Sequence, residues 1–256
     1  MTSPNAAIAR RFAKARHTYD AAAHVQKVIV RTLMSYAAPH LPTAAKRTLE
    51  IGCGTGELSR ALLEKVRIDV LILNDLYPEI RQNPANPHGE TQYLIGDIEQ
   101  LPLPDSLDLV VSSSCLQWLK DLPALLERAH GALQDDGVFV FSSFSTENLH
   151  QIKHLTNQGL DYYSLKDYEN LLTAAGFQIL HLSEQQYELN FDSPKAVLKH
   201  LQNTGVTATS ADFRWTKSTL TQFMQDYQRK FAWQDDAGKW HYPLTYHAVY
   251  GVVGKA

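Results

Sequence analysis

Residues 48–56 read Thr-Leu-Glu-Ile-Gly-Cys-Gly-Thr-Gly, an apolar strand that runs directly into a glycine-rich turn. Helical spacing begins at once behind the turn, at Glu57. The glycines stand at alternate positions: Gly52, Gly54 and Gly56. Glycine permits a sharp turn and a close ligand approach, because no Cβ stands in the way. Glu50 precedes the turn, where its carboxylate can reach polar groups of that ligand. This stretch therefore predicts a strand–turn–helix unit that binds a cofactor.

The spacing of these glycines restricts the kind of cofactor. It differs from the Gly-x-Gly-x-x-Gly of dinucleotide sites and from the Gly-x4-Gly-Lys-Ser/Thr of phosphate loops. No lysine directly follows the glycines, so a triphosphate would lack its usual cation. The stretch resembles motif I of class I S-adenosylmethionine (SAM) methyltransferases, whose cofactor carries no phosphate. An ordinary βα turn is the alternative, but it seldom has this whole pattern.

Length and composition point to one globular domain. A chain of 256 residues with 44% apolar content suits one α/β domain with insertions. No apolar run is long enough to span a membrane, and the N-terminus has no signal-type apolar core. We therefore expect a cytoplasmic protein without a membrane partner. Cys53 and Cys115 are expected to pack at strand ends, and the eleven scattered histidines lack metal-ligand spacing, so no metal is expected.

The charge is unevenly distributed along the chain. The formal net charge is −3, yet residues 1–47 carry eight basic side chains against one acid, Asp20. A basic N-terminal helix usually presents a solvated face. The alternative is a docking surface for an acidic partner, either nucleic acid or an acidic carrier protein.

Apolar runs and helical spacing alternate through the first part of the chain. The predicted strands are 47–51, Asp69–Asn74, Gln92–Ile95, Leu107–Ser112 and Val138–Ser143, with helices over 57–66 and 121–133. Two prolines make Asn83–Gly89 a loop. Short, buried strands separated by helices are typical of a parallel sheet covered on both faces.

The pattern changes after the fifth strand. A helix over 164–175 and a long strand over 178–190 lead into a polar, mostly helical stretch and a final strand over 242–253. Two further strands fit the seven-stranded, mostly parallel α/β sheet of Rossmann-like methyltransferases, whose last strand is antiparallel. The expected division of the single domain, 1–256, is a helical cover over 1–42, a SAM-binding core over 43–190, a helical lid insertion over 191–240 and the final strand over 241–256.

Polar residues fall at the carboxyl ends of the predicted strands, where open parallel sheets bind ligands. Asp75, with Leu76 beside it, can accept both ribose hydroxyls of an adenosine; a helix cap is the alternative. Asp97 can accept from the adenine amino group while Ile98 packs on the ring; an ordinary Asp turn is the alternative. The cofactor candidates are completed by a small polar stretch after the fourth strand, which would contact the methionine part through Ser113 and Gln117.

Five passages narrow the resemblance to the malonyl-acyl-carrier-protein O-methyltransferases of early biotin synthesis. They are Phe12–Asp20 with Val25-Gln26, the glycine turn, Gly96–Leu103, Phe191–Gly205 and Tyr242-Pro-Leu-Thr-Tyr-His247. The first three recur in many SAM methyltransferases, whereas the last two are far more specific. One departure is the loop after Asp75, where the general pattern has a regular helix.

The resemblance implies a reaction and a partner. A malonyl group, thioester-linked to an acyl carrier protein, is methylated on its free carboxylate, and malonyl-coenzyme A stays open as a substrate. The carboxylate is ionised at neutral pH and is already the nucleophile. Most of the rate gain is therefore expected from aligning carboxylate oxygen, methyl carbon and sulfur in a dry site.

Five side chains are candidates for holding the malonyl carboxylate. Tyr19, Tyr246 and His247 are possible orienting donors, and Arg214 or Lys217 is a possible counter-charge. Tyr246 and His247 alternate along a strand, so at most one of them faces the site. Packing is the alternative for Tyr246, and solvation is the alternative for the two cations. Tyr19 is favoured because a break in a helix above the cofactor suits a lid residue.

Two other functions compete with this interpretation. Another small-molecule SAM-dependent C- or O-methyltransferase, of the quinone or sterol type, would share the first three passages but not the last two. A nucleic-acid-binding or RNA-methylating protein would use the basic N-terminal segment. The fourth strand, however, is not followed by the Asn/Asp-Pro-Pro-Tyr/Phe tetrad common in base amino-methylation, so no nucleic acid partner is expected.

Overall fold

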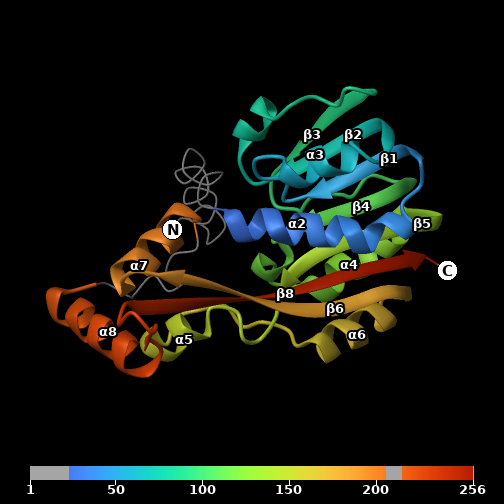
Figure 1. Ribbon diagram of the computed structural model, residues 1–256. Coiled ribbons are helices and arrows are strands. Elements are labelled where there is room, and N and C mark those ends of the chain that lie inside the picture. Colours follow the sequence, from blue (N-terminus) through green and yellow to red (C-terminus); the bar gives the residue numbers. More distant parts are fainter. Residues whose placement is uncertain (1–22, 206–214, 256) are drawn as a thin grey trace.

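One mixed sheet organises the computed structural model, which describes residues 23–205 and 215–255 (Figure 1). The strand order is β3-β2-β1-β4-β5-β8-β6, and a short strand, β7, pairs with β8 off this path. The strands are β1 Ala44–Ile51, β2 Arg67–Asp75, β3 Glu90–Ile95, β4 Leu107–Ser113, β5 Leu133–Phe144, β6 Phe177–Phe191, β7 Trp233–Gln234 and β8 Trp240–Lys255.

Helices cover both faces of this sheet. The α-helices are α2 His24–Ala37, α3 Glu57–Leu63, α4 Leu122–Ala132, α5 His150–Thr156, α6 Leu165–Ala174, α7 Pro194–Asn203 and α8 Lys217–Lys230. Short 3₁₀ helices are η1 Ala38–His40, η2 Pro78–Gln82 and η3 Leu116–Trp118. Side chains of α2 and α3 belong to one buried cluster and those of α4 and α6 to another, on opposite faces of the sheet. No helix in the described part of the chain is long and apolar enough to cross a membrane.

The strands are buried on both faces because their side chains alternate between these two clusters. In β2, Leu71 and Leu73 pack with α2 and α3, whereas Ile72 between them packs on the other side. Strands buried on both faces have continuous apolar sequences, and these runs were the basis for predicting them. The predicted α/β fold with helices on both faces is confirmed.

Strand β8 is antiparallel to both of its neighbours, as predicted for the last strand. Its pairing with β5 runs from Val138↔Gly254 to Phe144↔Ala248, where β5 ends. Its pairing with β6 continues further, to Phe191↔Tyr242. The first residues of β8 therefore form a two-stranded arm with β6 that extends past the carboxyl-end edge of the parallel strands (Figure 1).

Short polar residues set where the later helices begin. The Ser164 hydroxyl accepts a hydrogen bond from the Asp167 N–H, and the Asp167 carboxylate accepts one from the Ser164 N–H, a complete capping box at α6. Thr216 and Thr219 form the same arrangement at α8. Ser193 caps α7, whose first residue is proline, a residue that needs no N–H partner there.

The structure departs from the sequence prediction at three places. Residues 135–137, expected to end the helix predicted over 121–133, lie near the start of β5, within a register shift in its pairing with β4. Helix α5 was not predicted, because its seven residues are held by contacts with β8 rather than by a periodic apolar face. The stretch between β6 and β8 contains α7 and α8, as its helical pattern indicated, but also the strand β7, which was not predicted. The predicted break in the N-terminal helix at Tyr19 lies outside the described residues.

Replacing Gly251 by Ala tests the packing of β8. A Cβ at this position would lie 2.2 Å from Cε1 of Phe141, which is buried at the centre of the sheet. We expect the free energy of unfolding to fall by about 1–3 kcal/mol, because the added methyl overpacks the core. Urea denaturation measures this. The matched control is Gly254→Ala, whose Cβ would meet its nearest atom at 3.5 Å. Equal losses in both variants would show that Phe141 does not restrict this strand.

Candidate functional site

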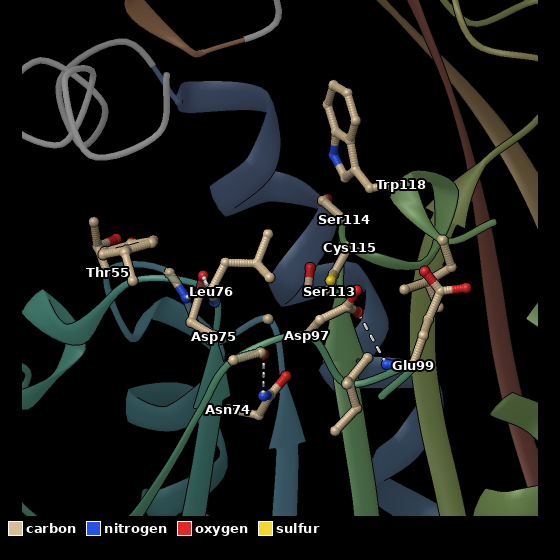
Figure 2. A pocket seen from close by; sticks show the side chains of 16 residues that line it. Thr55, Asn74, Asp75, Leu76, Asp97, Glu99, Ser113, Ser114, Cys115 and Trp118 are labelled. Carbon is tan, nitrogen blue, oxygen red and sulfur yellow. Dashed lines mark hydrogen bonds between the residues drawn. The ribbon is translucent and has the colours of Figure 1, made fainter. Parts of the chain in front are cut away.

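A cavity opens at the carboxyl ends of the parallel strands (Figure 2). Its walls come from the glycine turn after β1 and from the ends of β2, β3 and β4. The lining residues include Gly52, Gly54, Asp75, Leu76, Asp97, Ile98, Ser113 and Trp118. Of the predicted cofactor residues, these are the ones that the fold brings together around this first cavity. Trp118 was expected close behind the methionine contacts, with core packing as its alternative, and it also lines the cavity.

The glycine turn has the backbone conformation that its composition predicts. Gly52, Gly54 and Gly56 have φ values of +67°, +53° and +81°, in the region that favours glycine. A Cβ on Gly52 would also lie 2.3 Å from Sγ of Cys115, so the end of β4 requires a glycine there. Gly56 lines neither cavity described here and instead begins α3. The Asn83 amide holds the turn by donating to the Gly54 carbonyl at 3.0 Å.

Asp75 connects this turn to the end of β2. One carboxylate oxygen accepts from the Gly54 N–H at 2.9 Å and the other accepts from the Leu76 N–H at 2.7 Å. Burial raises the pKa of Asp75 to about 6. The carboxylate thus fixes the turn and also faces the cavity, where it can accept further hydrogen bonds. Its ribose role stays a prediction.

The loop after β3 forms the opposite wall. Asp97 accepts from the Glu99 N–H at 3.0 Å, the local bond of an Asp turn, while Ile98 is buried. From α4, Arg128 donates to the carbonyls of Ile98 and Glu99 at 3.0 and 3.2 Å. These bonds fix the backbone on which the predicted adenine contacts depend.

A second cavity lies between the glycine turn and the start of α2. It shares Gly52, Gly54 and Ser113 with the first cavity, so the two adjoin along the turn. Gln26 and Ser114 also line it, and their side-chain oxygens are buried without a hydrogen-bond partner in the described residues. Buried polar atoms are normally paired, so these two oxygens are distinctive among the residues that line this cavity. Sequence analysis named Gln26 only within the first passage of the family resemblance and did not propose it as a cofactor residue.

Glu50 lies at the bottom of this second cavity and is 2% exposed. The Ser59 hydroxyl donates a short hydrogen bond to its carboxylate. Burial, reinforced by the nearby Asp75 charge, raises the pKa of Glu50 to about 8. A carboxyl group that is costly to ionise alone is well suited to a cationic ligand group.

The remaining candidates lie elsewhere. Gln117 lines neither cavity, and its amide donates to the Ser114 carbonyl at 2.6 Å. Lys217 is exposed at the start of α8. Tyr19 and Arg214 fall outside the described residues, so their roles stay predictions.

Tyr246 and His247 face opposite sides of β8, as their alternation predicted. The Tyr246 hydroxyl lies 2.8 Å from Nε2 of His200 on α7. His247 accepts at Nδ1 from the Glu147 N–H at 3.3 Å, and its Nε2 lies 3.3 Å from the Glu184 carboxylate. Both His247 nitrogens therefore have partners within the fold, and neither residue lines the two cavities.

The two cysteines pack as the sequence predicted. Cys53 is buried and Cys115 lies against the glycine turn. Burial raises the pKa of both thiols, that of Cys115 to about 12. Both are therefore uncharged at neutral pH. Among residues 23–205 and 215–255, no cluster of His, Cys, Asp and Glu side chains could hold a metal ion.

Glu50→Gln tests the cost of this buried carboxyl group. Because its pKa is 4.5 ordinarily and about 8 in the fold, folding stability falls as pH rises between these values. Gln keeps an acceptor for Ser59 but cannot ionise. At pH 8, without ligand, the variant should be more stable by on the order of 3 kcal/mol, and the gain should vanish near pH 4. Denaturation at both pH values measures it, with the exposed Glu64→Gln as control. A gain that does not change with pH would contradict the ionisation argument.

Comparisons with known proteins agree with this geometry. The methyltransferase-domain family matches residues 21–182. In solved structures, a Bacillus halodurans protein assigned as a methyltransferase has a TM-score of 0.61 and 18% identity, covering 88% of this chain and 98% of its own. A phosphoethanolamine N-methyltransferase of Haemonchus contortus, bound to S-adenosylhomocysteine, has a TM-score of 0.59 and 16% identity, covering 100% of this chain and 60% of its own. These two likenesses establish the fold.

A curated relative is much closer in sequence. The malonyl-acyl-carrier-protein O-methyltransferase of Acinetobacter baylyi is 44% identical over 245 residues, which are 95% of this chain and 94% of the relative. Identity at this level extends over nearly the full length of both chains. The chain therefore belongs to the malonyl-acyl-carrier-protein O-methyltransferase family.

Proposed function

We propose that this protein transfers the methyl group of SAM to the free carboxylate of a malonyl group carried by an acyl carrier protein, a step at the start of biotin synthesis. The observation that carries the proposal is the pair of adjoining cavities along the glycine turn, in a chain of this family, with the carboxyl group of Asp75 at one and that of Glu50 at the other. The residues present suit SAM, whose adenosine needs hydrogen-bond acceptors and whose methionine end needs both charges matched.

Each of the two cavities would hold a different part of the cofactor. Asp75 would accept the ribose hydroxyls in the first cavity, with Asp97 and Ile98 at the adenine. In the second cavity, Glu50 would face the methionine ammonium group, and the unpartnered oxygens of Gln26 and Ser114 would complete the polar contacts. A neutral Glu50 would release its proton when this cation binds, because a nearby positive charge favours the carboxylate.

The protein's part in the reaction is alignment rather than acid–base chemistry. Bound SAM supplies an activated methyl group on a sulfonium. The malonyl carboxylate, ionised at neutral pH, needs no general base. What the chain must do is exclude water and hold the carboxylate oxygen in line with the methyl carbon. Tyr19 is the proposed orienting donor, with Arg214 or Lys217 offsetting the carboxylate charge.

The insertion over 191–240 is the proposed lid and acyl pocket. Its helices are attached to the β6–β8 arm, which extends beyond the edge of the sheet where the cavities open. Phe223 and Tyr227 of α8 are buried, and the Tyr227 hydroxyl donates to the Pro243 carbonyl at 2.5 Å. This attachment supports a lid that stays docked on β8 while substrate enters beside α2.

Methyl transfer is tested with purified protein, SAM and malonyl-loaded carrier, followed by mass spectrometry. We expect one added methyl on the malonyl carrier and none on an acetyl-loaded carrier, which lacks the free carboxylate. Tyr19→Phe should lower the rate on the order of tenfold to a hundredfold with SAM affinity unchanged, since it removes one hydrogen bond to a charged group. Malonyl-coenzyme A is run in parallel to define the acceptor. An unmodified malonyl carrier would exclude the proposed function and favour another small-molecule methyltransferase.

Carrier docking is tested through charge. Lys195 and Lys199 are exposed and four residues apart, so they share one side of α7. Carrier proteins are generally acidic, so salt should raise the apparent KM for carrier and leave that for SAM nearly unchanged. Changing both lysines to Glu should raise the carrier KM and flatten its salt dependence. Lys65→Glu, at the amino end of β2, is the control. Parallel salt effects on carrier and SAM would show that these lysines are only solvated.

A further inference from the structure

The two cavities of the proposed cofactor site share part of their lining. Both are lined by Gly52, Gly54 and Thr55 of the glycine turn and by Ser113 and Ser114 at the end of β4. In SAM, the sulfonium sulfur is bonded both to the adenosine and to the methionine chain. A cofactor whose adenosine lies in the first cavity and whose methionine end lies in the second must therefore carry its sulfur past these shared residues.

Ser114 holds a backbone conformation that serine seldom adopts. Its φ is +54°, in the left-handed region that favours glycine. The other described residues that have a positive φ without being glycine, Ser106, Leu149 and Asn157, line neither cavity. A residue keeps such a conformation only where its surroundings fix it. The position of Ser114 therefore depends on the contacts that hold it.

The Gln117 amide holds Ser114 from outside the cavities. The Ser114 N–H donates to the Ser142 carbonyl on β5 at 3.0 Å, and the Ser114 carbonyl accepts from Nε2 of Gln117 at 2.6 Å. Both torsion angles of Ser114 lie between these two backbone groups, so the pair of hydrogen bonds opposes a change in either angle. Without the amide, only the N–H side of the residue would keep its bond to β5.

Ser143 and Tyr168 determine which way the Gln117 amide points. Oε1 of Gln117 accepts from the Ser143 hydroxyl at 3.4 Å, and the Ser143 oxygen accepts from the Tyr168 hydroxyl at 2.7 Å. Burial raises the pKa of Tyr168 to about 12, so its hydroxyl keeps the proton that it donates. The amide therefore turns Nε2 toward the Ser114 carbonyl. The reverse orientation would place two oxygens 2.6 Å apart.

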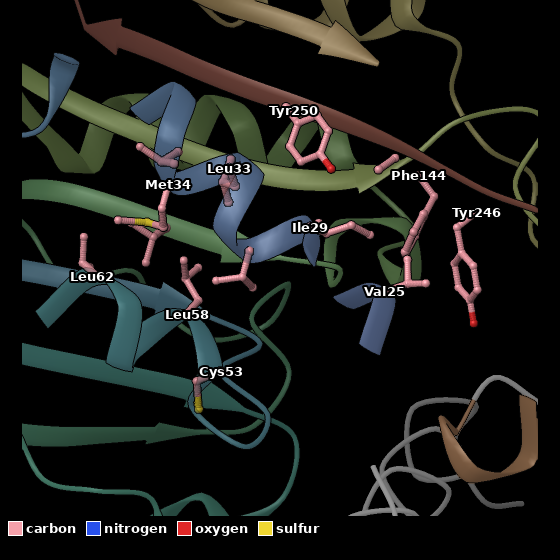
Figure 3. Close-up of a cluster of buried hydrophobic side chains, with 14 of the residues drawn as sticks. Val25, Ile29, Leu33, Met34, Cys53, Leu58, Leu62, Phe144, Tyr246 and Tyr250 are labelled. Atoms are coloured by element: carbon pink, nitrogen blue, oxygen red, sulfur yellow. The ribbon is translucent and has the colours of Figure 1, made fainter. Parts of the chain in front are cut away.

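The α2–α3 side of the second cavity is held by apolar packing. Leu58 of α3 lines this cavity, and Figure 3 shows it in the buried cluster that includes Ile29 and Leu33 of α2. Close-packed side chains of this kind have little room to move. Loss of the Gln117 amide would therefore shift the Ser114 side of the cofactor site relative to a fixed α2–α3 side.

We infer that Gln117 is a positioning residue that, through Ser114, sets where the methyl group of SAM lies relative to the malonyl carboxylate. Methyl transfer requires the carboxylate oxygen, methyl carbon and sulfur in line, and a displacement of about 1 Å can lower the rate on the order of a hundredfold. Gln117 lines neither cavity, so its loss should affect the rate of transfer more than the affinity for SAM. The inference rests on the proposed function and adds the residue that aligns the methyl donor.

Single-turnover methyl transfer to malonyl carrier, at saturating SAM, tests this inference in the full-length protein. Gln117→Ala removes the amide, whereas Gln117→Glu keeps an acceptor for Ser143 but cannot donate to Ser114. The matched control is Gln134→Ala. The Gln134 amide donates at 3.1 Å to the carbonyl of Ser106, which also has a positive φ, +57°, but lines neither cavity. Calorimetry gives the SAM affinity of each protein, and Tm reports folding.

The role of the backbone conformation is tested by repeating Gln117→Ala in two backgrounds, Ser114→Gly and Ser114→Ala. Both backgrounds lack the Ser114 hydroxyl. Glycine adopts the left-handed conformation readily, whereas alanine resists it as serine does. The Gln117 amide should therefore matter less when residue 114 is glycine.

We expect Gln117→Ala and Gln117→Glu to lower the single-turnover rate on the order of tenfold to a hundredfold, with SAM affinity changed by less than about threefold. Gln117→Ala should cause a similar loss in the Ser114→Ala background but a loss of only about threefold or less in the Ser114→Gly background, because the two residues are coupled. Gln134→Ala should keep the wild-type rate.

Three results would overturn the inference. A wild-type rate in both Gln117 variants would show that Ser114 keeps its position without the amide. Equal losses in the two Ser114 backgrounds would show that Gln117 does not act through this backbone conformation. Losses explained by weaker SAM binding or lower Tm, or matched by Gln134→Ala, would show a general structural role. A wild-type protein that leaves malonyl carrier unmodified would instead refute the proposed function, and the inference with it.

Discussion

The antiparallel insertion of β8 between β5 and β6 is the constraint on which the rest of the structure depends. The C-terminal part of β8 closes the core, where Tyr250 and Val252 pack under α2. Its N-terminal part has no β5 partner before Ala248 and pairs instead with β6 and, at its first residues, with the short strand β7. A strand that runs against the parallel ones must enter the sheet from their carboxyl ends. The chain therefore passes the carboxyl-end edge of the parallel strands, where ligands bind, before β8 enters the core. The helices α7 and α8, which are attached to the arm, lie at this edge for the same reason.

The way β8 enters the sheet explains why the Tyr242–His247 passage is so specific to this family. The Pro243 carbonyl accepts from Tyr227 on α8, and Thr245 exchanges hydrogen bonds with Gln151 on α5. Tyr246 contacts α7, and His247 contacts the turn before α5. The passage thus attaches two helices of the insertion, α7 and α8, and the α5 region after β5 to the sheet. The motif is conspicuous in the sequence because several contacts, rather than one catalytic group, fix its residues.

Much of the fold and part of the site could be predicted from sequence because both depend on local signals. Buried parallel strands are apolar runs, and the turns after them need Gly52, Asp75 and Asp97 at their ends. What escaped prediction depends on long-range register. Helix α5 has no periodic apolar face and is held by β8, and the unpartnered oxygen of Gln26 is apparent only from its burial in the fold.

The carboxyl groups of Glu50 and Asp75 lower the stability of the ligand-free fold but suit the binding of a ligand. Glu50 and Asp75 both lie where burial raises their pKa, so the fold accepts a cost that its hydrogen bonds from Ser59, Gly54 and Leu76 offset only in part. A ligand that carries one positive charge and two hydroxyl donors would remove most of this cost. A ligand that pairs with both carboxyl groups would therefore stabilise the folded protein on binding, and the site would prefer such a ligand. A neutral nucleoside would satisfy Asp75 but leave Glu50 protonated, which is a physical reason for the site to prefer a cofactor with an amino-acid end.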